Sequence, residues 1–390
     1  MTGGLRKPAG GRRTASAAVA ASLACALAGC SSPVAFYRPG EGAPDGPVAA
    51  LPGPAPYVRA RTEPPVPVAA ARTDVYAATR AGMLRPAVRS VPHRLYVPDA
   101  RTGRVGVVDQ RTLRVVGRLP VRSGRVVAGW DLRRLWSDGA VPVSPRTGRA
   151  GRAAPGAGAA GTVYFDPSGR DALVPAGRRL DVLDPGTLRR RGSVRLPCTP
   201  RHADFSADGT FLLAACPWAG RVVRVDPARR EVTGVLALPP GARPGDLRLA
   251  PDGSVFYVTD AARGGVWLVD GLALRAAGFV PTGPGARGPV VSRDARRLYV
   301  LDDGGVTAID FAARSAAARW PLPAGDAEAG GVSADGSLLW LASPGRGTVY
   351  ALSTRTGETV HRVKVGGRPQ APLVYPQPGH HSLGGPGLYR

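Results

Sequence analysis

The sequence repeats one short pattern seven times. In each repeat a strand-like apolar triplet is followed, about a dozen residues later, by an apolar pair that ends in Asp or Ser. A period of about 40 residues built from short strands is typical of β-propeller blades. The sequence therefore predicts an all-β fold, a seven-bladed β-propeller with four-stranded antiparallel blades. The residues that end the seven pairs are Asp109, Ser144, Asp184, Asp226, Asp270, Asp310 and Ser353.

Residues 1–29 have the pattern of a lipoprotein signal peptide. A basic head precedes an apolar run, Ala15–Ala28, which is too short for a permanent membrane span. The run leads into Cys30 through small residues and resembles a bacterial lipobox, in which this cysteine receives the lipid and becomes the mature N-terminus. We expect export and anchoring to the outer face of the cytoplasmic membrane through Cys30. Arg12 and Arg13 leave a twin-arginine export route open.

The rest of the chain divides into a tether and the propeller. Residues 30–73 are rich in Pro and Ala and poor in large apolar residues, so we predict a disordered, extended tether. Residues 74–390 form the predicted propeller. Its low-complexity stretch at residues 149–161 falls between two blades, where an insertion costs little.

Export also changes the interpretation of the cysteines. Cys25 belongs to the signal peptide and Cys30 carries the lipid, which leaves Cys198 and Cys216. The repeat places both at strand ends on one face of the propeller, and the exported compartment favours a disulfide between them. The alternative is two buried free thiols.

The formal net charge of +24 comes almost entirely from arginine, because only Lys7 and Lys364 are lysine. Such a surface favours anionic neighbours. We expect the membrane itself, anionic envelope polymers or another envelope protein as partners. We expect no nucleic acid, because an exported chain seldom meets it, and we expect a monomer.

The repeat also predicts how the ring closes. The segment Pro372–Tyr375 has the pattern of an innermost strand and follows the last outer strand. We expect it to complete the first blade, so that both ends of the chain close the ring. In the alternative, residues 87–91 supply that strand and the C-terminal tail packs outside the ring. The adjacent His380 and His381 leave metal binding open as an alternative, and we expect them to be exposed.

Several segments resemble known proteins. Arg94–Val121 reads RLYVPDARTGRVGVVDQRTLRVVGRLPV and resembles a YVTN-type β-propeller repeat. DVYAATRAGML at Asp74–Leu84 and YPQPGHHSLG at Tyr375–Gly384 further resemble a group of actinobacterial exported propeller lipoproteins. Their C-terminal segment reads closer to PQPGRYSLGHTG, so this chain departs from it at His380, His381 and Pro386. The resemblance implies the fold and export but supplies no catalytic residue.

The candidate site residues lie on the face that carries the outer-to-innermost and second-to-third strand connections, which we call the top face. The sharpest pair is His202 with Asp204, since a carboxylate can orient and charge an imidazole. An acidic ring there would select a cation, an amine or sugar hydroxyls, although Asp also favours turns. The residues proposed to bind a ligand are Arg201, His202, Asp204, Asp246, Asp99, Asp138, Asp260 and Asp302.

The chain carries no nucleophile elbow, zinc motif, haem motif or phosphate-binding glycine loop. We therefore expect no cofactor, no metal and no catalytic residue. The leading hypothesis is a lipid-anchored propeller that binds a ligand or a protein at its top face. The alternatives are a propeller enzyme, such as a lactonase-like hydrolase or an oxidoreductase subunit, and a structural envelope protein.

Overall fold

The computed structural model describes residues 74–157, 161–385 and 387–390. They belong to the second of two compact units, residues 65–390. The signal peptide, the lipidation site Cys30 and the tether lie outside the described residues. No helix in the described part of the chain is long and apolar enough to cross a membrane.

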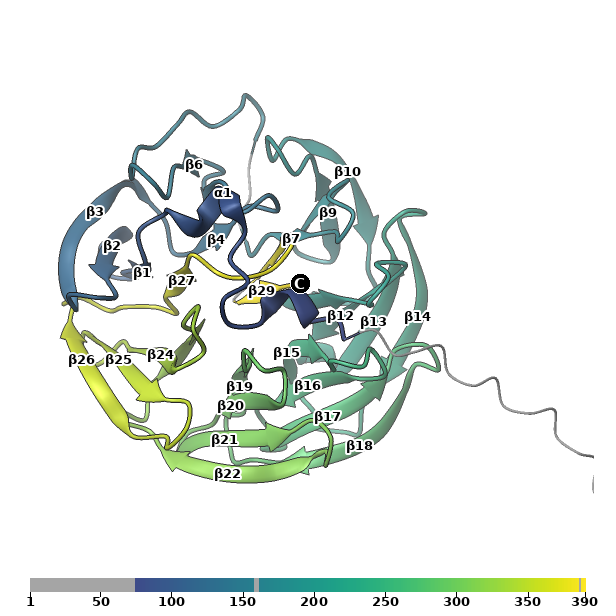
Figure 1. The fold of residues 1–390 in the computed structure, drawn as a ribbon. Helices are drawn as coiled ribbons and strands as arrows, with labels where there is room; N and C mark the ends of the chain where they lie inside the picture. The colour runs from purple at the N-terminus through teal and green to yellow at the C-terminus, as the bar shows by residue number, and fades with distance from the viewer. Residues whose placement is uncertain (1–73, 158–160, 386) are drawn as a thin grey trace, which may run out of the picture. The chain divides into compact units, whose positions relative to one another are not determined.

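The described residues form seven antiparallel sheets arranged as blades around a ring (Figure 1), which confirms the predicted seven-bladed β-propeller. Blades 4 to 7 are four-stranded sheets in which the chain runs from the innermost strand outward. Blade 4 contains β11 (His202–Phe205), β12 (Leu212–Cys216), β13 (Arg221–Asp226) and β14 (Glu231–Ala237). Blade 5 contains β15 (Pro244–Leu249), β16 (Phe256–Asp260), β17 (Gly265–Asp270) and β18 (Arg275–Pro281). Blade 6 contains β19 (Arg287–Val291), β20 (Arg297–Leu301), β21 (Gly305–Asp310) and β22 (Ser315–Pro321). Blade 7 contains β23 (Glu328–Val332), β24 (Leu338–Ser343), β25 (Thr348–Ser353) and β26 (Thr359–Lys364).

Blade 1 combines segments from both ends of the propeller. Its innermost strand is β27 (Leu373–Tyr375), which pairs antiparallel with β1 (Arg94–Pro98), so that Tyr96 lies opposite Leu373. The blade continues outward through β2 (Arg104–Asp109) and β3 (Arg114–Arg122). The predicted closure by the C-terminal strand is confirmed. The alternative segment, residues 87–91, is not used as a strand, because Pro86–Arg89 forms the short helix α1.

Blades 2 and 3 flank the low-complexity stretch and are less regular. Blade 2 contains β4 (Val126–Ala128), β5 (Leu135–Ser137) and β6 (Pro142–Val143), and an isolated bridge from Val143 to Ala150 occupies the fourth position. Blade 3 contains β7 (Tyr164–Phe165), β8 (Ala172–Pro175), β9 (Arg179–Leu183) and β10 (Arg190–Arg195). Two further strands, β28 (Ser382–Gly384) and β29 (Leu388–Tyr389), extend the blade 3 sheet inward beyond β7.

The core lies between neighbouring blades. Strand residues that alternate along the pleat bury their apolar side chains against the next sheet. Leu95 of blade 1, for example, packs in one cluster with Trp340 of blade 7, and both are fully buried. The Asp residues that end the third strands accept hydrogen bonds in the turns that follow, as expected. Asp109 is one of them, and its carboxylate accepts hydrogen bonds from the backbone N–H groups of Arg111 and Thr112.

Candidate functional site

A cavity of about 790 Å³ opens among the innermost strands. Its lining includes Trp218 and Asp303, which lie in second-to-third strand connections, and Arg125, which precedes an innermost strand. The cavity therefore opens on the top face, where the sequence predicted a site. Its volume lies within the range of about 300–1,000 Å³ that is usual for small-molecule sites.

His202 and Asp246 lie in the cavity wall, and the buried Tyr164 lies behind His202. His202 begins β11, and its Nδ1 lies 2.7 Å from Oδ1 of Asp246 in β15 and 3.2 Å from the hydroxyl of Tyr164 in β7. The side chains of His202 and Asp246 are only 12% and 16% exposed. Three adjacent blades thus meet at one imidazole.

The electrostatic surroundings of Asp246 favour its charged form. Burial by itself raises the pKa of this carboxyl, but the attraction and hydrogen bond of His202, together with Arg248 and Arg125, hold the pKa well below its usual range. Asp246 is therefore a carboxylate at neutral pH, able to orient the imidazole. The backbone carbonyl of Asp246 also accepts a hydrogen bond of 3.1 Å from the Thr259 hydroxyl, which fixes this part of β15.

Arginines surround this group at the starts of the innermost strands. Arg125 precedes β4, Arg201 precedes β11, Arg243 precedes β15 and Arg287 begins β19, so these four arginines come from four blades. A fifth, Arg248 of β15, also lines the cavity. Arg287 forms an ion pair of 2.8 Å with Asp303. Arg125 donates to the Thr162 hydroxyl. The guanidinium carbon of Arg243 lies 5.4 Å from the ring centre of Trp218, a side chain that is 72% exposed.

The remaining carboxylates of the cavity are held by neighbouring groups. Asp326 accepts hydrogen bonds from the Ser343 hydroxyl and from the N–H of Gly345. Glu328, at the start of β23, accepts a hydrogen bond of 2.8 Å from the backbone N–H of Ala371. Burial raises the pKa of the Glu328 carboxyl, against the opposing effect of that hydrogen bond and of nearby arginines.

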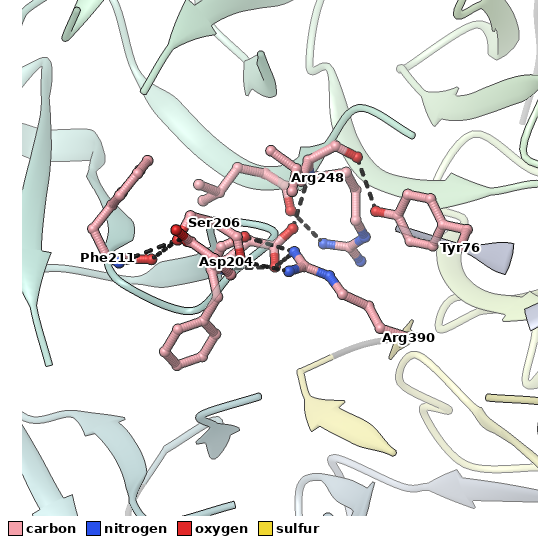
Figure 2. A network of polar contacts seen from close by, with 10 residues as sticks. Tyr76, Asp204, Ser206, Phe211, Arg248 and Arg390 are labelled. Atoms are coloured by element: carbon pink, nitrogen blue, oxygen red, sulfur yellow. Dashed lines mark hydrogen bonds and ion pairs between the residues drawn. The ribbon is translucent and has the colours of Figure 1, made fainter. Parts of the chain in front are cut away.

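The structure separates Asp204 from the pair predicted for it. Asp204 is fully buried and lies outside the cavity lining, and Figure 2 shows its carboxylate facing the guanidinium of Arg390. Arg390 Nη2 donates a hydrogen bond of 2.8 Å to Asp204 Oδ1. The other carboxylate oxygen, Oδ2, accepts a hydrogen bond of 2.9 Å from the N–H of Leu249. His202 is instead paired with Asp246, so of the predicted residues Arg201, His202 and Asp246 come together at the cavity.

The four predicted acids of the top-face connections do not line the cavity. Asp302 is fully buried and paired with Arg319 through both carboxylate oxygens, each at 2.7 Å. Asp260 accepts from the indole N–H of Trp267 and from backbone N–H groups. Asp99 accepts a hydrogen bond from the Thr102 hydroxyl in its own turn, and Asp138 accepts one from the N–H of Gly124 in the connection between blades 1 and 2. These residues stabilise the loops around the cavity, and the acidic ring expected at the site is absent from the lining that the described residues form.

The C-terminal tail, residues 376–385 and 387–390, closes the cavity from within. Gly385 and Gly387 contribute to its lining, and β28 lies against the innermost strands β4 and β7. Figure 1 shows β29 and the C-terminal end near the middle of the ring. On the face opposite the cavity opening, the Arg390 side chain donates a hydrogen bond of 2.8 Å to the backbone carbonyl of Ser206. On the same face the Tyr76 hydroxyl donates one of 2.9 Å to the backbone carbonyl of Leu249.

The expectation of exposed tail histidines is wrong for His381. Its ring stacks on Trp130 with centres 5.7 Å apart. Burial, assisted by the charges of Arg390 and His380, lowers the pKa of the His381 imidazole to about 4. His380 is exposed. No group of three or more His, Cys, Asp or Glu side chains among the described residues has the arrangement of a metal site.

The two propeller cysteines form the predicted disulfide. Cys198 follows the outer strand β10 of blade 3, and Cys216 ends β12 of blade 4. Their Cα atoms are 6.0 Å apart, within the usual range for a bridge, and both residues are buried. The bridge joins two neighbouring blades.

The sequence prediction missed most of the arginines of the cavity, as well as Tyr164 and Glu328. In a chain with so many arginines no single one stands out. A signal was nevertheless present, because Arg201, Arg243 and Arg287 recur with the period of the blades, each just before or at an innermost strand. Reading the repeat for residues at equivalent positions would have found them.

Two solved structures with TM-scores above 0.5 support the same class, the seven-bladed β-propellers. A functionally unknown protein from Desulfotomaculum acetoxidans superposes with a TM-score of 0.58 at 15% identity, over 73% of this chain and 100% of that one. Dihydro-heme d1 dehydrogenase NirN, in complex with DHE, gives a TM-score of 0.54 at 14% identity, over 76% of this chain and 78% of that one. Hydrazine synthase from Kuenenia stuttgartiensis gives a TM-score of 0.40 at 17% identity, over 54% of this chain and 87% of that one. No family model and no curated protein matches the chain. At these identities the likeness extends to the fold alone.

Proposed function

We propose that this protein is an exported, lipid-anchored β-propeller of the YVTN type that binds a small molecule in its top-face cavity and acts as a ligand-binding module at the cell envelope. The observation that carries the binding role is the cavity of about 790 Å³, whose wall holds the His202–Asp246 pair. A concave site with a few convergent polar side chains is the usual form of a ligand pocket. The lipid anchor rests on the lipobox-like sequence before Cys30.

One observation favours a second candidate, a propeller enzyme such as a lactonase-like hydrolase. The carboxylate of Asp246 orients the His202 imidazole inside a cavity, which is how many general bases are positioned. An enzyme of this kind would lose turnover of its substrate in His202→Gln while still binding it. The binding module has no turnover to lose.

The test uses the full-length protein and a chemically diverse fragment library with anionic, neutral and cationic members. Binding is followed by ligand-observed NMR. Ala261 lines the cavity and its neighbour Ala262 does not, so Ala261→Trp should abolish binding of the cavity ligands and Ala262→Trp should leave it intact. Fragments that bind both variants equally, or no binding fragment at all, would contradict the proposed binding role.

A further inference from the structure

Some of the charged side chains that line the cavity form ion pairs, and others form none. Of its basic side chains, Arg287 is paired with Asp303, His202 lies against Asp246, and Arg248 donates to the backbone carbonyl of Leu247. Arg125, Arg201 and Arg243 form no ion pair within the described part of the chain. The carboxylates, by contrast, are engaged by His202, Arg287, the Ser343 hydroxyl or backbone N–H groups. The cavity thus offers cationic groups in excess.

These guanidiniums come from blades on different sides of the cavity. Arg125 precedes β4 of blade 2, yet its charge acts on Asp246 of blade 5 and on Glu328 of blade 7. Its guanidinium donates to the hydroxyl of Thr162, which precedes β7 of blade 3. Arg125 therefore extends toward blade 3, the neighbour of blade 4, where Arg201 and His202 lie.

The rim adds a flat apolar surface. Trp218 lies in the connection after β12 and lines the cavity with most of its side chain exposed, and Arg243 is stacked beside it. Deeper in the cavity, Val126, Val290 and Leu373 contribute apolar lining. Such walls fit the body of an organic molecule rather than a bare inorganic ion.

On these grounds, and resting on the proposed function, we infer that the ligand is a small soluble organic oxyanion. Its carboxylate or phosphate would bind between Arg125 and Arg201, and its planar body would lie toward Trp218. The planar fork of arginine matches both oxyanions through paired hydrogen bonds. This is the reverse of the cation or amine that an acidic ring would select.

The test compares matched probes that differ in charge. Phenyl phosphate and benzoate should bind the full-length protein at least about 10-fold more tightly than phenol or benzylamine, measured by ligand-observed NMR titration. Arg125→Gln and Arg201→Gln should each weaken phenyl phosphate binding by about 10-fold, because each removes a charge-assisted hydrogen bond. Arg362→Gln makes the same charge change at an exposed position of β26 outside the cavity and should have no effect.

Two outcomes would overturn the inference while leaving the proposed function intact. In the first, phenol or benzylamine binds in an Ala261→Trp-sensitive manner as tightly as phenyl phosphate does. In the second, phosphatidylglycerol vesicles bind in an Arg125-dependent manner and soluble phenyl phosphate does not. If none of the probes and no library fragment binds, the proposed function itself fails. Circular dichroism and thermal unfolding confirm that each variant is folded.

Discussion

At the scale of single residues, the main finding is a buried ion pair. Asp204 is completely buried, and Arg390, which is 6% exposed, reaches it from a position 186 residues further along the chain. The Arg390 guanidinium also donates to the carbonyls of Phe205 and Ser206. The pair therefore fixes the C-terminal tail to the end of β11 away from the cavity opening.

Removing one charge of this pair should be costly. Asp204→Asn leaves a buried guanidinium without its counter-charge, so we expect the free energy of unfolding to fall by about 3–5 kcal/mol, measured by urea denaturation. Asp303→Asn is the control, because Asp303 is 65% exposed in its pair with Arg287 and exposed pairs contribute at most about 1 kcal/mol. Equal losses in the two variants would contradict the role assigned to Asp204.

The sequence predicted individual residues well where they belong to the repeat. Asp109 and its equivalents were expected in turns and are found there, and His202 and Asp246 were placed on the correct face. The partner of His202 was missed, because the carboxylate nearest in sequence, Asp204, is engaged by a side chain from the far end of the propeller. A repeat describes contacts within and between blades. It carries no information about contacts made by a segment that occurs once.

At the scale of elements, the strands of blades 4 to 7 and the closing strand β27 follow from the sequence, whereas β28 and β29 do not. The blade strands have the alternation and turn residues that mark a sheet. The strand β28 consists of three residues, Ser382–Gly384, and it pairs with β7 through Gly384 opposite Tyr164. So short a strand is stabilised by its surroundings in the ring rather than by its own residues.

Gly384 shows how tightly the tail is fitted. Its φ is +70°, and a Cβ at this position would meet the carbonyl of Val163 at 2.0 Å. Gly366 has a similar φ of +78° with no atom within 4 Å, which makes it a matched control. Gly366→Ala should cost only the conformational strain, about 1 kcal/mol. Gly384→Ala should cost at least about 2 kcal/mol more, because the tail must shift away from β7. Urea denaturation measures both, and equal costs would mean that β28 is not held as described.

At the scale of the whole molecule, the proposed lipid at Cys30 sets where the protein works. A lipid-modified N-terminus retains an exported protein at the membrane through its acyl chains. We expect Cys30→Ala to move the protein from the membrane fraction to the exported soluble fraction. Cys25→Ala changes the other cysteine of the same N-terminal segment and should leave the protein at the membrane. Immunoblots of fractionated cells give the answer, and membrane retention of Cys30→Ala would rule out the anchor.

The closure of blade 1 has a consequence for the order of folding. The strands β1 and β27 of this blade are separated in sequence by all the other blades, so the innermost position of blade 1 stays empty until residues 373–375 have been made. Until then β1 presents an unpaired sheet edge, which can pair with other chains. Blades 4 to 7 are built from consecutive residues and can form as the chain emerges. The edge of β1 is therefore covered only late, when β27 joins it, and β28 and β29 cover β7 later still along the chain.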